Sequence, residues 1–275
     1  MAEFNRLRLV PSLEIVDWQL QLRREAELRV VEGHFIEAER AAISAAAAMA
    51  PTEPYAMLEW LEQLRESEAE RGRRLFGWLA ESASHGAMSW FLIQELSGED
   101  GAEDLFALAQ LRLPARPKLE IARCYWDEMG QGQALATRAS IMSELTQHMR
   151  SDVTPAPVWE RLARSNLMLA LTANRRYGFQ ALGALGVQEL TSAEPAQQLA
   201  MGLERLSFSL EASAYFAARA RLAPLRSHAW THDVILPLVA RDSRAATAIA
   251  EGALLRLQAS ERCFSRYARD LGVPL

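Results

Sequence analysis

Apolar residues recur along most of the chain at the spacing i, i+3, i+4 and i+7, with polar residues between them. This spacing puts the apolar side chains on one face of a helix, whereas a strand requires strict alternation, which is nearly absent here. Proline and glycine separate the helical segments from one another. The sequence therefore predicts an all-α protein.

The prolines and glycines also mark where the helices are expected to end. Helices are predicted over about residues 13–49, 55–81, 86–95 and 196–223, with a short helix between the turn segments 97–101 and 113–117 and a long helix after Pro155 and Pro157. No repeat and no change of composition divides the chain. One domain over residues 1–275, a bundle of roughly eight to ten helices, is therefore expected.

Charge and hydropathy limit the classes of partner. The net charge is −5 and the isoelectric point is near 5.7, so the basic surface that binds nucleic-acid phosphates is not expected. The run of small apolar residues at 41–50 is too short to span a bilayer, contains Ser44 and ends at Pro51. Neither a nucleic acid nor a membrane is predicted as a partner.

Cysteine use indicates the compartment. Cys124 and Cys263 are far apart in the sequence and form no Cys-x-x-Cys pair, so neither a disulfide framework nor a zinc site is predicted. No apolar segment follows Arg6 and Arg8 to complete an export signal. A reducing cytoplasm is the expected location.

The most distinctive segment runs from Glu120 to Gly132 and reads EIARCYWDEMGQG. Other short matches follow it in order, within a region from about residue 94 to 252: NRRY at 174–177, GLERL at 202–206, YF at 215–216 and VILPLV at 234–239. Together these segments resemble the signature of the haem-oxygenase-like di-iron oxidases, or iron-containing redox enzymes. The resemblance implies a haem-oxygenase-like helical bundle that holds two iron ions between carboxylates and imidazoles.

The resemblance also implies which positions would carry the iron ligands. Glu95, Glu128 and Glu189 match the carboxylate positions, with Asp127 as the alternative to Glu128. The positions expected to hold histidine carry arginine instead, and the expected aspartate is an alanine; these residues are Arg138, Arg219, Arg226 and Ala223. A guanidinium group has no free acceptor and stays charged, so it cannot ligate a cation. No metal cofactor is therefore predicted at this site.

Two histidines close to these positions offer another ligand pair. His228 and His232 are four residues apart on one helix face, with Asp233 adjacent, a spacing that two metal ligands can adopt. No upstream residues supply matching partners for them. Surface or partly buried histidines are the favoured interpretation.

The first functional hypothesis is a metal-independent, oxidoreductase-like enzyme of specialised small-molecule biosynthesis. Its substrate would be an anionic, amino-acid-like molecule, because guanidinium groups bind carboxylates well. The residues assigned to hold this substrate are Arg138, Arg219, Arg226 and Tyr215. The general base would be Glu95, Glu128 or Glu189, with a pKa raised by burial.

The second hypothesis is a non-catalytic partner subunit of another biosynthetic enzyme. In it, the three arginines face Glu95, Glu128 and Glu189 and close the former metal cavity with salt bridges. A third alternative is an active non-haem iron oxidase with an altered ligand set. An open cavity beside the arginines favours the enzyme, and a closed core favours the partner subunit. The alanine-rich segment 41–50 also allows a homodimer contact.

Overall fold

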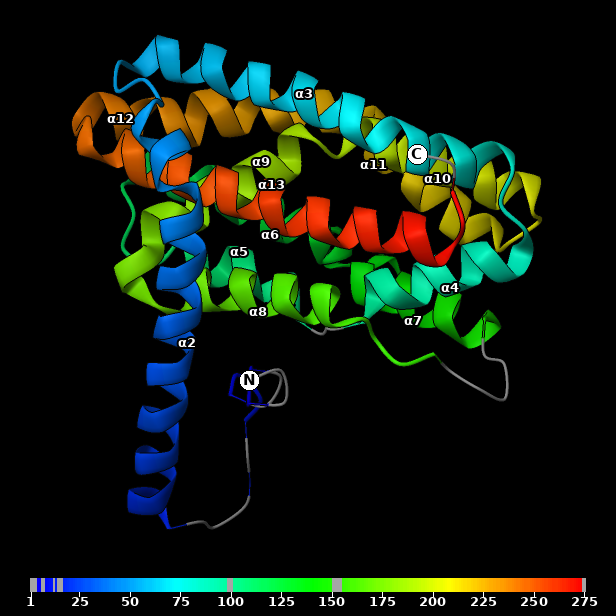
Figure 1. Ribbon diagram of the computed structural model, residues 1–275, viewed down its shortest axis with the longest axis horizontal. Coiled ribbons are helices and arrows are strands. Elements are labelled where there is room, and N and C mark those ends of the chain that lie inside the picture. Colours follow the sequence, from blue (N-terminus) through cyan, green and yellow to red (C-terminus); the bar gives the residue numbers. More distant parts are fainter. Residues whose placement is uncertain are drawn as a thin grey trace.

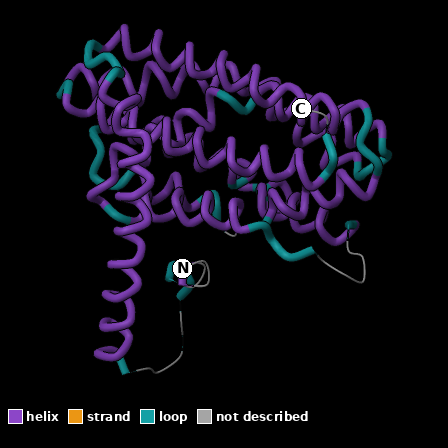
Figure 2. Tube along the Cα trace, viewed as in Figure 1, coloured by secondary structure: helices purple, strands orange, loops and turns teal. Residues whose placement is uncertain are grey.

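The computed structural model describes residues 4–5, 8–11, 13, 17–97, 101–149 and 155–273, without the side chains of residues 146–148. Every regular element within these ranges is a helix, and no strand occurs there (Figure 2). The prediction of an all-α fold is confirmed. The main elements are α2 (Trp18–Ala48), α3 (Pro54–Glu81), α4 (His85–Leu96), α5 (Asp104–Ala109), α6 (Ala115–Glu128), α7 (Arg138–His148), α8 (Trp159–Ala173), α9 (Gly178–Leu190), α10 (Ala193–Arg205), α11 (Leu210–Ala229), α12 (Leu236–Arg241) and α13 (Arg244–Asp270).

Shorter turns of helix join some of these elements. They are the 3₁₀ turns Gly130–Gly132, Ala134–Ala136 and Arg175–Tyr177, and a π-helical segment, Trp230–Ile235, between α11 and α12. None of the described helices is long and apolar enough to cross a membrane. Cys124 and Cys263 are both buried and free, in agreement with the prediction that they form no disulfide.

Helix α13 lies in the middle of the bundle. It packs most extensively against α9 and also contacts α2, α3 and α8. Figure 1 shows α3 and α13 running lengthwise, with α4 and α8 along the side opposite α3. Because α13 is covered from several directions, its side chains Ile249, Ala253 and Leu255 are fully buried.

Helix α2 joins the bundle mainly through its C-terminal half. Ile36, Ile43 and Ala47 of that half are buried in the core. The N-terminal half extends beyond the bundle (Figure 1), where Trp18 and Leu22 are exposed. The helix thus presents apolar side chains that the described part of the chain leaves uncovered.

The single helix predicted over about 196–223 is wrong, because two helices occupy this region. Helix α10 ends at Arg205, and the chain turns at Ser207, whose φ is 56°. Ser209 then caps α11: its Oγ accepts a hydrogen bond from the backbone N–H of Ala212 at 3.1 Å. The two helices pack against each other, and Pro224 lies inside α11 without ending it.

Helices α9 and α13 cross with their backbones in direct contact. An added Cβ atom would lie 1.9 Å from the carbonyl oxygen of Ile249 at Gly183, and 1.8 Å from that of Gln180 at Gly252. No other residue has room at either position, since the obstructing atoms belong to the backbone. The two glycines therefore set the distance between the central helices.

Replacing Gly252 with alanine is expected to destabilise the fold strongly. The new methyl group would force α9 and α13 apart, and overpacking of this kind costs roughly 1–3 kcal/mol or more. The midpoint of thermal unfolding should fall by several degrees. Gly77→Ala in α3 is the matched control: its new Cβ meets nothing within 4 Å, so its midpoint should stay the same or rise slightly. Equal midpoints for the two variants would contradict the close approach.

Candidate functional site

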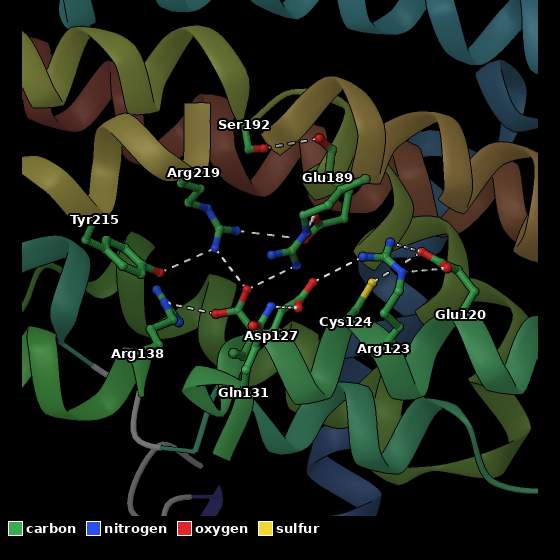
Figure 3. A network of polar contacts seen from close by, with 12 residues as sticks. Glu120, Arg123, Cys124, Asp127, Gln131, Arg138, Glu189, Ser192, Tyr215 and Arg219 are labelled. Carbon is green, nitrogen blue, oxygen red and sulfur yellow. Dashed lines mark hydrogen bonds and ion pairs between the residues drawn. The ribbon is translucent and has the colours of Figure 1, made fainter. Parts of the chain in front are cut away.

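The structure brings six of the seven predicted site residues into one cluster. They are Glu128 at the end of α6, Arg138 at the start of α7, Glu189 near the end of α9, and Tyr215, Arg219 and Arg226 on α11. Arg219 and Arg226 are two helical turns apart and therefore lie on one face of α11. In Figure 3 the side chains of Tyr215, Arg219, Arg138 and Glu189 point toward one another from these helices.

Glu128 is the centre of the cluster. Its Oε1 accepts hydrogen bonds from Nη1 of Arg219 at 3.0 Å and from Nη2 of Arg226 at 3.1 Å. Its Oε2 lies 3.9 Å from Nε of Arg138. One carboxylate thus contacts all three arginines that stand at the predicted histidine positions.

The adjacent acid, Asp127, has a different role. It accepts hydrogen bonds from Nη1 of Arg123 at 3.1 Å and from Nε2 of Gln131 at 3.0 Å, and Figure 3 draws its contacts to these two side chains. Its partners lie on the outer side of α6 and the following turn. Glu128 is therefore the acid of the Trp-Asp-Glu segment that faces inward.

Glu189 shares the same arginines. Its Oε2 lies 2.7 Å from Nε of Arg226, in an ion pair whose N–H is not directed at the oxygen, and its Oε1 lies 3.8 Å from Nη2 of Arg219. The side chain of Glu189 is only 1% exposed. Two acids and two arginines, each arginine touching both acids, form one buried ionic cluster.

The positive charges of the cluster outweigh the usual effect of burial on the pKa of a carboxylate. Burial by itself raises the pKa of Glu128, but the positive charges of Arg219, Arg138 and Arg226 outweigh it and hold the pKa at about 2. The expectation that burial would raise this pKa is wrong for that reason. A carboxylate with a pKa near 2 is a weak proton acceptor at neutral pH.

Glu95 lies apart from this cluster, and the expectation that it would face the same three arginines is wrong. Its two carboxylate oxygens accept from Nη2 of Arg164 at 2.6 and 2.8 Å, and Oε1 also accepts from the hydroxyl of Tyr267 at 2.8 Å. Nε and Nη2 of Arg161 donate to its backbone carbonyl oxygen. Helix α8 thus supplies the arginines that pair with the end of α4.

The pKa of Glu95 is also lowered rather than raised. Burial raises it, but the charges of Arg164 and Arg161 together with the hydrogen bonds from Arg164 and Tyr267 hold it at about 2. Glu95 is therefore ionised and fully engaged, as Glu128 is. The site contains two separate groups of acids and arginines.

A cavity of about 250 Å³ touches both groups. Its polar wall includes Glu95, Arg138, Arg164, Tyr215 and Arg219, and its apolar wall includes the rings of Phe76, Phe91, Phe216 and Phe264. A second cavity, of about 510 Å³, is also lined by Arg138, Arg164 and Arg219 and reaches Glu128. Open space therefore lies beside arginines whose carboxylate partners are already in place.

A family model described as iron-containing redox enzyme matches residues 89–261, which is more than half of the chain. The chain belongs to the iron-containing redox enzyme family. The match extends from α4 into α13 and contains all the predicted site residues. The resemblance inferred from the Trp-Asp-Glu segment is thereby confirmed. No curated protein matches the chain.

The iron of this family requires ligands that can donate a lone pair, and guanidinium groups have none. Around Glu128 and Glu189, two of the three predicted histidine positions, Arg219 and Arg226, place guanidinium nitrogens 2.7–3.1 Å from carboxylate oxygens. Within the described ranges, no group of three or more His, Cys, Asp or Glu side chains is placed to hold a metal ion. The residues of this site do not fit a di-iron centre.

The two histidines of α11 and the π-helical segment do not join the cluster. The rings of His228 and His232 stack with their centroids 3.9 Å apart, and His228 is exposed. Asp233, next to them, pairs with Arg116 at 2.7 Å. The interpretation of this pair as surface or partly buried histidines agrees with the structure.

Four further residues that no sequence motif indicated also line the cavities: Arg161, Arg164, Gln188 and Arg256. For Arg256 the apolar pattern of the sequence contained a signal. Arg256 falls in the same helical row as Ile249, Ala253 and Cys263 of α13, all of them fully buried. A charged residue on a buried stripe is a candidate for a site, because an isolated charge in a core is costly.

Replacing Arg226 with methionine is expected to destabilise the protein. The change keeps much of the side-chain volume but leaves Glu128 and Glu189 with fewer cations, and breaking a buried ion pair costs roughly 3–5 kcal/mol. Unfolding in urea should show this loss. Arg116→Met removes a pair whose side chains are 63% and 38% exposed, so it should change stability by about 0–1 kcal/mol. Equal losses in both variants would show that the cluster does not stabilise the fold.

Stability should fall as the pH decreases from about 4.5 to 2. Glu95 and Glu128 have a pKa of about 2 in the folded chain and an ordinary value of 4.5. The unfolded chain takes up the protons first, so the stabilisation is complete above pH 4.5 and is lost toward pH 2. Urea unfolding at several pH values measures this slope. Glu128→Gln should flatten it, whereas Glu66→Gln, at a side chain 68% exposed, should leave it unchanged.

Proposed function

We propose that the chain is a metal-independent enzyme of small-molecule biosynthesis that acts on an anionic, amino-acid-like substrate. The observation that supports this most directly is the cavity of about 250 Å³ that opens beside Arg138, Arg219 and Tyr215. Concave sites with an apolar wall and a few polar groups are where small molecules bind. Family membership gives the class of redox enzyme, and the cavity suggests what the site accepts.

The roles of the charged residues follow from their partners. Arg138, Arg219 and Tyr215 line the cavity and are assigned to contact the substrate. Arg226 is turned toward Glu128 and Glu189, so we assign it to hold Arg219 in place through the acids that they share. It thereby acts on the substrate through Arg219.

The three acids first considered as general bases are better suited to hold the arginines. Glu95 and Glu128 have a pKa of about 2, far below the working range of a proton acceptor near neutral pH. Glu68 of α3 also lines the cavity, and burial raises its pKa. Its Oε2 is buried with no hydrogen-bond partner in the described structure, and Nη1 of Arg71 lies 4.0 Å from it. We assign to Glu68 the exchange of protons with the substrate.

A second candidate is a non-catalytic subunit that binds another biosynthetic enzyme or a second copy of the chain. The ionic cluster of Glu128, Glu189, Arg219 and Arg226 favours it, because these residues already satisfy one another. The exposed apolar half of α2 would supply a contact surface. In either case we place the protein in a reducing cytoplasm, in keeping with its two free cysteines.

Metal content separates these functions from iron chemistry. Protein expressed in iron-supplemented medium should contain far less than one iron per chain by elemental analysis, because the cluster offers too few ligands. A family member with the complete set of histidines serves as the control. About two irons per chain would overturn the metal-independent function.

Activity separates the enzyme from the subunit. The purified protein, dialysed against a chelator, should convert at least one member of a panel of amino acids and related carboxylates in air, as followed by mass spectrometry. Conversion should be lost in Arg219→Gln. Absence of conversion, together with stable binding to a co-purified enzyme, would favour the subunit instead.

A further inference from the structure

Arg256 is a partly buried arginine that has no carboxylate in ion-pair contact within the described structure. Its Nη1 donates to Oγ of Ser260, its Nη2 donates to Oε1 of Gln188 at 3.4 Å, and its Nε has no hydrogen-bond partner in the described structure. Neither of the two acceptors carries a charge. No carboxylate of the described residues lies within 4.0 Å of the guanidinium group, although the other arginines of the site each have one.

The surroundings of Arg256 make the lack of an ion-pair partner unusual. Burial, together with the nearby charges of Arg164 and Arg161, lowers the pKa of Arg256 to about 10, against the opposing effect of Glu95. Glu68 lines the same cavity; burial raises its pKa and the charge of Arg256 opposes that rise, without an ion-pair contact between the two side chains. A buried charge is normally paired, because an isolated one costs free energy. An anion from outside the chain would remove that cost.

The guanidinium lies where such an anion could reach it. Arg256 and Gln188 line both cavities, and the side chain of Arg256 is only partly buried. The position is fixed by the crossing of α9 and α13, because Arg256 is one turn beyond Gly252. Ser260, one further turn along, orients the group.

We propose that Arg256, together with Gln188, binds the carboxylate of a ligand whose apolar body lies against the rings of Phe76, Phe91 and Phe264. A guanidinium fork matches the two oxygens of a carboxylate, and Oε1 of Gln188 helps to orient the fork. The three rings line the same cavity as Arg256. The volume of about 250 Å³ limits the ligand to a compact acid.

This site differs from the anchor assigned in the proposed function. Arg219 already pairs with Glu128 and Glu189, and Arg164 already pairs with Glu95, so an anionic ligand would not supply either arginine with its first counter-ion. An anionic ligand would supply Arg256 with the counter-ion that it lacks. The inference rests on the proposed function only in placing an anionic ligand in the same cavity.

The probe for this site is 3-phenylpropionate, with 3-phenylpropan-1-ol as its neutral counterpart. The acid should raise the midpoint of thermal unfolding of the full chain as its concentration increases, and the alcohol should not. Calorimetric titration should show that the affinity for the acid falls roughly tenfold or more in Arg256→Gln, as expected for a charge-assisted hydrogen bond. Arg256→Lys, which keeps the charge, should retain part of the affinity.

The stability of the ligand-free variants tests whether Arg256 has a purely structural role. Arg256→Gln removes a charge that has no ion-pair partner, so this variant should unfold at the same temperature as the wild type or at a higher one. Arg164→Gln leaves the carboxylate of Glu95 without its closest cation, so this variant should unfold at a lower temperature. A marked loss of stability in Arg256→Gln would assign the residue to the fold and overturn the site.

The binding results separate the two proposals. Affinity that is kept in Arg256→Gln but lost in Arg219→Gln would overturn the Arg256 site and leave the proposed function standing. Equal stabilisation by inorganic phosphate would overturn the match to an apolar carboxylate. No stabilisation of the wild type by 3-phenylpropionate would also overturn the site, while the iron content and the conversion assay would still decide the proposed function.

Discussion

A carboxylate buried inside a helical bundle requires a cation in contact with it, and this requirement organises the site of this protein. Glu95, Glu128 and Glu189 come from three different helices, and the buried Glu128 and Glu189 would each be costly to enclose without a cation. Family members are named for iron, which neutralises acids in such a bundle, whereas here guanidinium groups do so. The acids therefore remain ionised, and the helices that carry them are held together by charge.

The arginines also decide where space remains. A guanidinium is planar and reaches its partner from the end of a long side chain, so two of them can serve two carboxylates from one side. In the cluster, Arg219 and Arg226 approach Glu128 and Glu189 from α11. The region toward α3 and α13 is left to aromatic rings and to Arg256. Neutralisation and an open cavity are thus compatible within one bundle.

The sequence predicted the helical fold and most of the cluster because both depend on local patterns. Apolar spacing defines helices, and the order of short motifs placed Glu128, Glu189, Arg219 and Arg226 in one family framework. The break between α10 and α11 was missed because a positive φ at a serine leaves no signal in the apolar pattern. The local pattern therefore predicted which segments are helical better than it predicted where each helix ends.

The partner of Glu95 was missed for a different reason. Which arginine meets a given acid depends on how α4, α8 and α11 pack, and neither spacing nor motif order contains that information. Arg164 reaches Glu95 across 69 positions of sequence. The same holds for Arg256, whose place on a buried stripe could be seen, but whose lack of an acid could be established only from the packed helices.

The single oxygen Oε1 of Glu128, which accepts from both Arg219 and Arg226, also bears on how such a site evolves. Exchanging one of these arginines for histidine would remove a full charge from two acids and supply only one imidazole, too little for an iron pair. Each single step toward a metal site therefore passes through a less stable protein. Because two arginines share one oxygen, converting this cluster into a metal site would require several substitutions at once.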